Sequence, residues 1–163
     1  MPTLTSMSSL TISAAWAQLN RVPLGKQLFS KLIGFKIPYS GTIQPQVLEL
    51  SDGHAVVRMA DRRAVRNHLD CVHAIALMNL GELTTGLAMF HRLDGRAKGI
   101  VTGLRIEYVK KSRGPITATC DAAVPEVTGP TEFIVEGNLR DKSGDTVAKV
   151  WATWTLRGCS RKN

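Results

Sequence analysis

The chain has 163 residues, of which 44% are hydrophobic and 21% charged. These values are typical of a folded protein and exclude a disordered or collagen-like chain. The 21 Lys and Arg against 13 Asp and Glu give a net charge of +8, which favours anionic partners such as nucleic acid, anionic lipid or a phosphate-rich cofactor. The basic residues form no single block and do not alternate with aromatics, so we do not expect nucleic-acid binding.

The three cysteines and residues 1–20 bear on the cellular location of the protein. Cys71, Cys120 and Cys159 form no C-x-x-C or Cys/His ligand pattern, and an odd number does not indicate a disulfide framework. We therefore expect a reducing, cytoplasmic location and no metal site. Residues 1–20 lack a basic segment followed by a continuous apolar run, so we predict no secretory signal.

The first forty residues predict two helices. Residues 9–20 form a short amphipathic pattern, and residues 24–33 begin another that places Leu28, Leu32 and Phe35 at i, i+4 and i+7. We expect this second helix to pack over the edge of a sheet. The alternative is a basic amphipathic helix that lies on a membrane surface.

One stretch, residues 67–92, organises the rest of the chain. Its portion 72–90 predicts one long helix with apolar residues around nearly its whole circumference, which must be buried on all sides. At about 1.5 Å per residue it is shorter than about 30 Å, and it carries Asn79 and Glu82, so it does not predict a bilayer span. We expect a sheet to wrap around this helix.

Segments on both sides of this helix have the period of two that is typical of strands. Two pairs of them flank turns, Asp-Gly at residues 52–53 and Asp-Lys-Ser-Gly-Asp at 141–145, and predict hairpins. The order of elements predicts an α+β domain with an antiparallel sheet. The predicted strands are 47–50, 55–60, 100–110, 115–123, 131–140 and 146–157.

A curved antiparallel sheet around one apolar helix, preceded here by N-terminal helices, is the hotdog architecture. Asn67, then His73-Ala74, with Glu82 on the helix, resembles the active-site signature of PaaI-like hotdog thioesterases, in which Asn precedes His-Gly-Gly and an acid follows. A closer match is an uncharacterised bacterial hotdog branch with His-Ala. The resemblance implies one domain, with a hotdog core at 43–157 after a helical extension at 1–42.

Thioester hydrolysis needs an oxyanion donor and a carboxylate. The first N–H groups of a helix are unpaired at its positive end, so the Ala74 amide is a candidate oxyanion donor. Asp70 is a candidate N-cap of that helix. Glu82 lies nine residues after His73, about 14 Å away and half a turn round. A second copy of the chain is therefore needed to complete a site.

The resemblance implies an acyl-CoA thioesterase of fatty acid metabolism, with a site across a homodimer or in a dimer of dimers. It needs no cofactor beyond the coenzyme A of its substrate and no stable membrane insertion. In that picture Glu82 is nucleophile or general base, Ala74 N–H binds the oxyanion, Asn67 positions the nucleophile or loop, and His73 orients the thioester or helix start. Ile75 stands where the family's His-Gly-Gly has its second Gly, and we expect its larger side chain to narrow or redirect the tunnel for the acyl chain.

Further residues are candidates for substrate binding. Asn79 and Gly86 fall on the same stripe as Glu82, where they leave a polar contact and open space for a substrate. A turn after a strand carries three cations that can meet coenzyme A phosphates, although a solvated turn also explains them. These cations are Lys110, Lys111 and Arg113.

Each candidate also has a structural interpretation. His73 can bond to backbone at a helix start, Asn67 can cap a turn, and Arg105 can neutralise Glu82 in a dimer contact. The alternative function is a non-catalytic acyl- or acyl-CoA-binding hotdog protein. An acyl dehydratase is a third hypothesis, but the spacing of His73 and Glu82 in one chain does not place both at one carbon.

Overall fold

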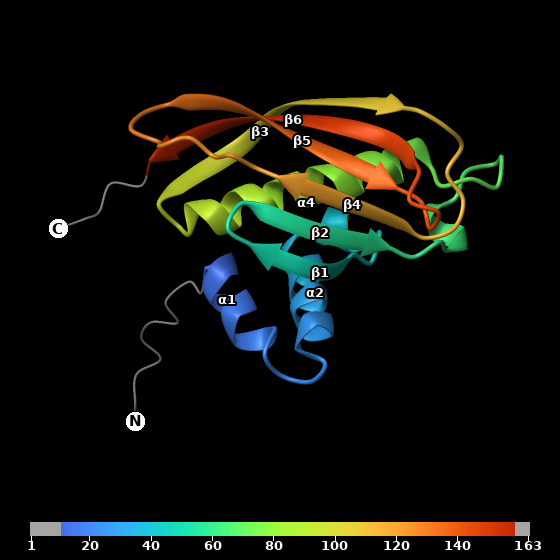
Figure 1. Cartoon of the computed structure of the whole chain (residues 1–163), viewed down its shortest axis with the longest axis horizontal. Coiled ribbons are helices and arrows are strands. Elements are labelled where there is room, and N and C mark those ends of the chain that lie inside the picture. The colour runs from blue at the N-terminus through green and yellow to red at the C-terminus, as the bar shows by residue number, and fades with distance from the viewer. Residues whose placement is uncertain (1–10, 159–163) are drawn as a thin grey trace.

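The computed structural model describes residues 11–158 (Figure 1). Helices and strands follow the predicted order, and the part of the first predicted helix before residue 11 lies outside the described residues. The elements are α1 (Ile12–Leu19), α2 (Gly25–Lys36), α3 (Pro38–Gly41), β1 (Gln46–Ser51), β2 (His54–Met59), the 3-10 turn η1 (Arg63–Val65), α4 (Ala74–Leu93), β3 (Ala97–Tyr108), β4 (Ile116–Asp121), β5 (Thr131–Arg140) and β6 (Thr146–Gly158).

The six strands form one antiparallel sheet in the order β1-β2-β4-β5-β6-β3. The sheet curves around α4, and α1 and α2 project beside β1 (Figure 1). Both predicted hairpins are present, β1 with β2 and β5 with β6. The predicted α+β class and hotdog fold are confirmed. Strands β1 and β3 are the two edges of the sheet.

Most of the 20 residues of α4 are buried, as its all-round apolar pattern predicts. Helix and sheet approach closely at Gly81, where a Cβ atom would lie 2.4 Å from a methyl group of Val150. The first half of α4 nevertheless keeps one uncovered stripe, Ile75, Met78 and Glu82, because the sheet covers only the other sides. Within residues 11–158 no helix combines the length and hydropathy needed to cross a bilayer.

Helix α2 packs against the body with a different face from the predicted one. Phe29 and Ile33 are buried, whereas Leu28, Leu32 and Phe35 are 50%, 44% and 84% exposed. The sequence of α2 holds two apolar stripes about 100° apart, since adjacent residues turn by that angle. The stripe with Phe29 is the one that contacts the core, so the expectation that the Leu28 stripe packs was wrong.

Candidate active site

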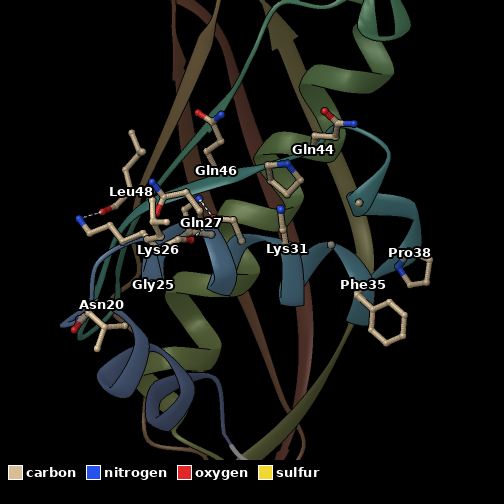
Figure 2. Close-up of a pocket in the computed structure, with 17 residues that line it drawn as sticks. Asn20, Gly25, Lys26, Gln27, Lys31, Phe35, Pro38, Gln44, Gln46 and Leu48 are labelled. Carbon is tan, nitrogen blue, oxygen red and sulfur yellow. Dashed lines mark hydrogen bonds between the residues drawn. The ribbon is translucent and has the colours of Figure 1, made fainter.

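Two cavities differ in their relation to the predicted site. A groove of about 1100 Å³ lies between α2 and β1 and contains none of the predicted site residues (Figure 2). A cavity of about 180 Å³ lies at the start of α4, where His73, Ile75 and Asn79 contribute to its lining together with Arg66 and Tyr39. The smaller cavity is therefore the one that adjoins the predicted chemistry.

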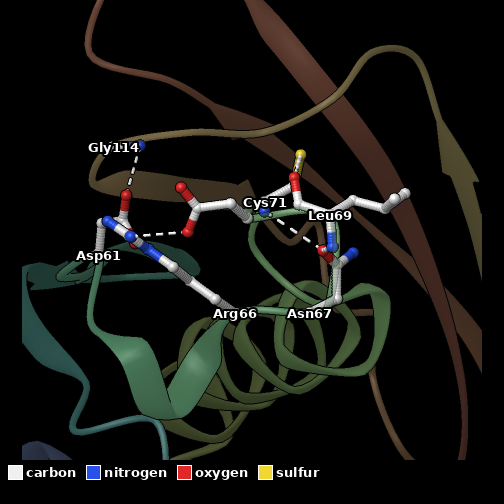
Figure 3. Close-up of polar contacts among 7 residues, drawn as sticks. Asp61, Arg66, Asn67, Leu69, Cys71 and Gly114 are labelled. Carbon is white, nitrogen blue, oxygen red and sulfur yellow. Dashed lines mark hydrogen bonds and ion pairs between the residues drawn. The ribbon is translucent and has the colours of Figure 1, made fainter.

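The loop before α4 is held by Asn67 (Figure 3). Its side-chain oxygen accepts hydrogen bonds from the N–H groups of Leu69, at 2.9 Å, and Cys71, at 3.2 Å. The Asn67 N–H donates to the Cys71 carbonyl at 2.8 Å. Asn side chains often close turns in this way. Asn67 thus shapes the loop that leads into the helix.

An ion-pair network that sequence patterns did not reveal braces the same loop (Figure 3). Arg66 binds Asp61 at 2.7 Å and Asp70 at 2.8 Å, and Asp61 also accepts from the Gly114 N–H at 2.8 Å. The hydrogen bond from Arg66 holds the pKa of the Asp61 carboxyl below its usual range. Asp61 and Arg66 are close in sequence but carry no motif, and their link to Gly114 spans distant segments.

The N-cap of α4 is His73, which corrects the expectation that Asp70 caps this helix. Asp70 adopts a φ of 55° and is engaged with Arg66. The Nδ1 atom of His73 accepts the N–H of Ile75 at 3.0 Å, so the proton of the neutral ring lies on Nε2. Within residues 11–158 the Ala74 N–H donates to no acceptor. A free donor therefore stands at the positive end of the helix dipole.

Tyr108, at the end of β3, joins the helix start through its hydroxyl, which donates to the Ala74 carbonyl at 3.1 Å. Burial raises the pKa of this phenol. In the sequence Tyr108 is simply the last residue of an alternating strand, so no signal marked it. Only the pairing of β3 with β6 brings it beside α4.

Asn79 and Gly86 do not share the open stripe of Glu82, which corrects that expectation. Asn79 is buried and donates to the Tyr39 carbonyl of α3 at 3.2 Å. A Cβ atom on Gly86 would lie 3.3 Å from the Trp154 ring, so this chain already fills the space there. Both lie within roughly 60° of Glu82 round the helix, but α3 covers Asn79 and Trp154 of β6 fills the space at Gly86.

Glu82 is the one acidic residue of α4, and it lies half-buried on the uncovered stripe. In the described part of the chain its carboxylate forms no hydrogen bond or ion pair, and burial raises the pKa of this carboxyl. Arg105 is not its partner in this chain, since it pairs with Glu107 and lies 4.6 Å over the Trp151 ring. Eight residues separate Glu82 from Ala74, about 12 Å along the axis, so one chain keeps them apart.

The basic turn after β3 divides into two parts. Lys110 lies between Asp141, at 2.7 Å, and Asp145, at 2.6 Å, and these contacts raise the pKa of the Lys110 ammonium. Lys111 and Arg113 are exposed, and among residues 11–158 they have no ion-pair partner. Two of the three predicted cations are therefore free to meet an anion.

Comparison with known proteins gives one family match and several solved structures. Residues 25–156 match a family described as a domain of unknown function, DUF4442. No curated protein matches the chain. A structural-genomics protein is 29% identical, with 91% of this chain and 99% of that chain covered and a TM-score of 0.78.

Two further structures carry thioesterase descriptions. A Pseudomonas aeruginosa protein of unknown function, called a probable thioesterase, is 23% identical, with 85% and 97% of the two chains covered and a TM-score of 0.73. A hypothetical thioesterase protein of Streptococcus pneumoniae, solved with coenzyme A, is 18% identical, with 77% and 97% covered and a TM-score of 0.66. The chain thus belongs to the DUF4442 family and has the hotdog fold.

Proposed function

We propose that this protein is a thioesterase that hydrolyses acyl-coenzyme A at a site shared by two copies of the chain. The observation that carries the proposal is the carboxylate of Glu82, which is half-buried and unpartnered on the uncovered stripe of α4. Partial burial without a partner makes it harder to ionise a carboxylate, and carboxylates with perturbed pKa values are frequent at active sites. The free Ala74 N–H at the start of the same helix supplies the complementary donor.

The edge strand β3 supports a two-chain site. Within residues 11–158 it pairs only with β6. Leu104 and Tyr108 point to the helix side of the sheet, because their register partners Ala152 and Ala148 are buried there. They are still 44% and 49% exposed. An apolar surface beside a free strand edge is suited to a second copy of the chain.

A two-fold axis beside β3 brings the uncovered stripe of one copy against the helix start of the other. The Ala74 N–H of one chain then donates to the thioester carbonyl oxygen as negative charge develops on it. Glu82 of the other chain attacks the carbonyl carbon, or removes a proton from the water that attacks it. The carbon–sulfur bond breaks, and the released thiolate takes up the proton that Glu82 removed from water, or a proton from solvent. Where Glu82 is the nucleophile, water then hydrolyses the acyl–carboxyl anhydride, which releases the free acid and restores the carboxylate.

Three further side chains have roles in this proposal. The Nε2–H of His73 is available to orient the thioester, because Nδ1 is occupied by the helix N–H of Ile75. Lys111 and Arg113 are the cations that meet the coenzyme A phosphates. A similar fold solved with coenzyme A, that of the Streptococcus pneumoniae protein, supports this class of substrate.

The test is release of free thiol from short, medium, long and aromatic acyl-coenzyme A substrates. Wild type is expected to hydrolyse at least one class, and Glu82→Gln to lower kcat by roughly 10²–10⁴-fold, the range of lost acid–base catalysis. Glu132→Gln, on an exposed position of β5, is the matched control and should retain wild-type turnover. Full turnover by Glu82→Gln would exclude this mechanism.

Ile75 favours a second function, non-catalytic binding of acyl-coenzyme A. Its exposed side chain contributes to the cavity at the helix start, at the position where the resemblance has a glycine that lets substrate approach the backbone. Calorimetric binding of a non-hydrolysable acyl-coenzyme A analogue, with no thiol release from any thioester, would establish this function instead.

A further inference from the structure

Helix α2 has two sides that differ in their surroundings. One side is anchored to the body of the protein through buried Phe29, Ser30 and Ile33. The other presents four large apolar side chains to solvent along the whole length of the helix. These residues, called here the α2 apolar face, are Leu24, Leu28, Leu32 and Phe35, exposed by 44–84%.

Further exposed apolar residues flank the α2 apolar face in the sequence. Val22 precedes it, and Ile37 and Tyr39 follow it, and all three are exposed. Single exposed apolar residues are normal on protein surfaces, whereas several on one helix face mark a candidate site of interaction. Because buried Phe29 and Ile33 fix the other side of the helix to the body, this face is present before any partner binds.

The charge around this face has one sign. Lys31 and Lys36 lie roughly 60–80° to either side of Leu28, so they border the apolar face on both flanks. Arg21 adds a third cation just before the helix, and the first acidic residue of the chain is Glu49. Lys26 lies on the anchored side of α2, where its Nζ donates to the Leu48 carbonyl at 2.7 Å. Within residues 11–158 none of Arg21, Lys31 and Lys36 forms an ion pair.

The groove between α2 and β1 adjoins the same face (Figure 2). Leu24 and Phe35 belong to the α2 apolar face and also line the groove. Lys26 and Lys31 line the groove as well. In Figure 2 the Lys31 side chain points from α2 toward Gln44, and the Phe35 ring points the other way. Cationic and amide side chains therefore line the groove beside one part of the α2 apolar face.

We propose that α2 docks this protein onto an anionic lipid surface. The apolar face enters the boundary between head groups and acyl chains, and Arg21, Lys31 and Lys36 lie among the phosphates, as in other amphipathic helices at interfaces. A 12-residue helix is about 18 Å long, so it lies in the surface and does not span it.

Charge favours a lipid surface over a second copy of the chain as the partner of the α2 apolar face. A symmetric contact between two α2 faces would bring Lys31 and Lys36 of one copy toward the same cations of the other. Residues 11–48 contain no acid to offset them, so such a contact is repulsive. An anionic bilayer complements both the apolar stripe and its cationic border.

Co-sedimentation with vesicles tests the proposal directly and does not depend on catalysis. Wild type is expected to sediment with vesicles of phosphatidylcholine mixed with phosphatidylglycerol, less with phosphatidylcholine alone, and less at high salt. The double variant Leu28→Ser/Phe35→Ser should lose about tenfold or more of the affinity. The matched control Ile134→Ser removes an equally exposed apolar side chain on β5 and should bind as wild type does.

A second pair of variants tests the charge. Lys31→Glu/Lys36→Glu should abolish the preference for phosphatidylglycerol, whereas Lys142→Glu, in an exposed turn, should keep it. Thermal melts of each variant establish that it is folded. Failure of folded wild type to sediment with either vesicle would overturn the proposal. So would equal losses in the controls, or a change of oligomeric state in Leu28→Ser/Phe35→Ser without a change in sedimentation.

Discussion

The two edges of the sheet are treated differently by this chain. At β1, helix α2 covers the backbone groups that no strand pairs with. Ser30 Oγ accepts the Val47 N–H at 2.8 Å, and Lys26 Nζ donates to the Leu48 carbonyl at 2.7 Å. At β3, a strand of 12 residues, only Ala97 is buried. The first edge is covered within the chain, whereas among the described residues the second has no strand or helix against it, as the proposed contact with another copy requires.

The same contrast holds for the polar groups near each edge. Ser30 is buried but satisfied, since its hydroxyl also donates to the Lys26 carbonyl at 2.8 Å. Glu82, on the side of α4 that no strand covers, has no such partner in the described residues. A satisfied polar group stabilises a fold, whereas a half-buried carboxylate without a protein partner is a candidate for chemistry or for contact with a second copy. We therefore expect the proposed activity to be most sensitive to changes on the β3 side.

The largest effect is expected from a charge at the β3 edge. Leu104→Glu places a carboxylate on the helix side of the sheet, where we propose that the second copy packs, so the assembly should dissociate. Because each site needs both copies, turnover should fall by about 10²-fold or more. Size-exclusion chromatography with light scattering and thiol release measure the two effects. Ile134→Glu, on the outer face of β5, serves as the control, and a monomeric variant with full turnover would refute the shared site.

A smaller effect is expected at the covered edge. Ser30→Ala leaves the buried N–H of Val47 without an acceptor, which should lower the free energy of unfolding by about 1–3 kcal/mol. Urea denaturation measures this difference, and turnover per folded molecule should not change. Ser143→Ala, in an exposed turn, should stay within about 0.5 kcal/mol of wild type. Equal stability of Ser30→Ala and wild type would show that α2 does not seal this edge.

The smallest effect is the pH dependence of stability at Glu82. Burial raises the pKa of this carboxyl in the folded state above its ordinary value of 4.5. Between the two pKa values the folded state binds more protons than the unfolded state, so wild type loses stability as the pH rises through that window. Glu82→Gln has no carboxyl to ionise at this position, so its stability should not fall across this pH window.

Melting temperatures across the pH range measure this difference. The variant and wild type should melt together below the ordinary carboxyl pKa, and the variant should melt higher near neutral pH. Glu132→Gln controls for the loss of one charge. A variant that melts lower than wild type near neutral pH would show that ionised Glu82 has a stabilising partner in the assembly.

The residues of the candidate site were visible in the local sequence, and their role stays a prediction. The order Asn67, His73, Ala74 and Glu82 is visible in the chain, and helical spacing alone shows that Glu82 cannot reach the helix start of its own chain. The contact of Tyr108 with Ala74 could not be predicted, because it joins segments 34 residues apart. Local patterns contain no information on such pairings.

The N-cap of α4 was missed for a related reason. Asp70 is a better N-cap by residue type than His73, but Arg66 engages the Asp70 carboxylate and the loop places His73 next to the first turn. Residue preference describes an isolated helix end. The loop around it decides which side chain reaches the free N–H groups.

The sequence by itself determined the strands, the two hairpins, the long central helix and therefore the hotdog fold, because apolar periodicity and turn residues act over a few neighbours. Only the tertiary structure decided which of two apolar stripes of α2 is buried and which stripe of α4 stays open. Both stripes of α2 satisfy the same helical period. The choice between them depends on what distant segments bring against the helix, and that is a property of the packed molecule.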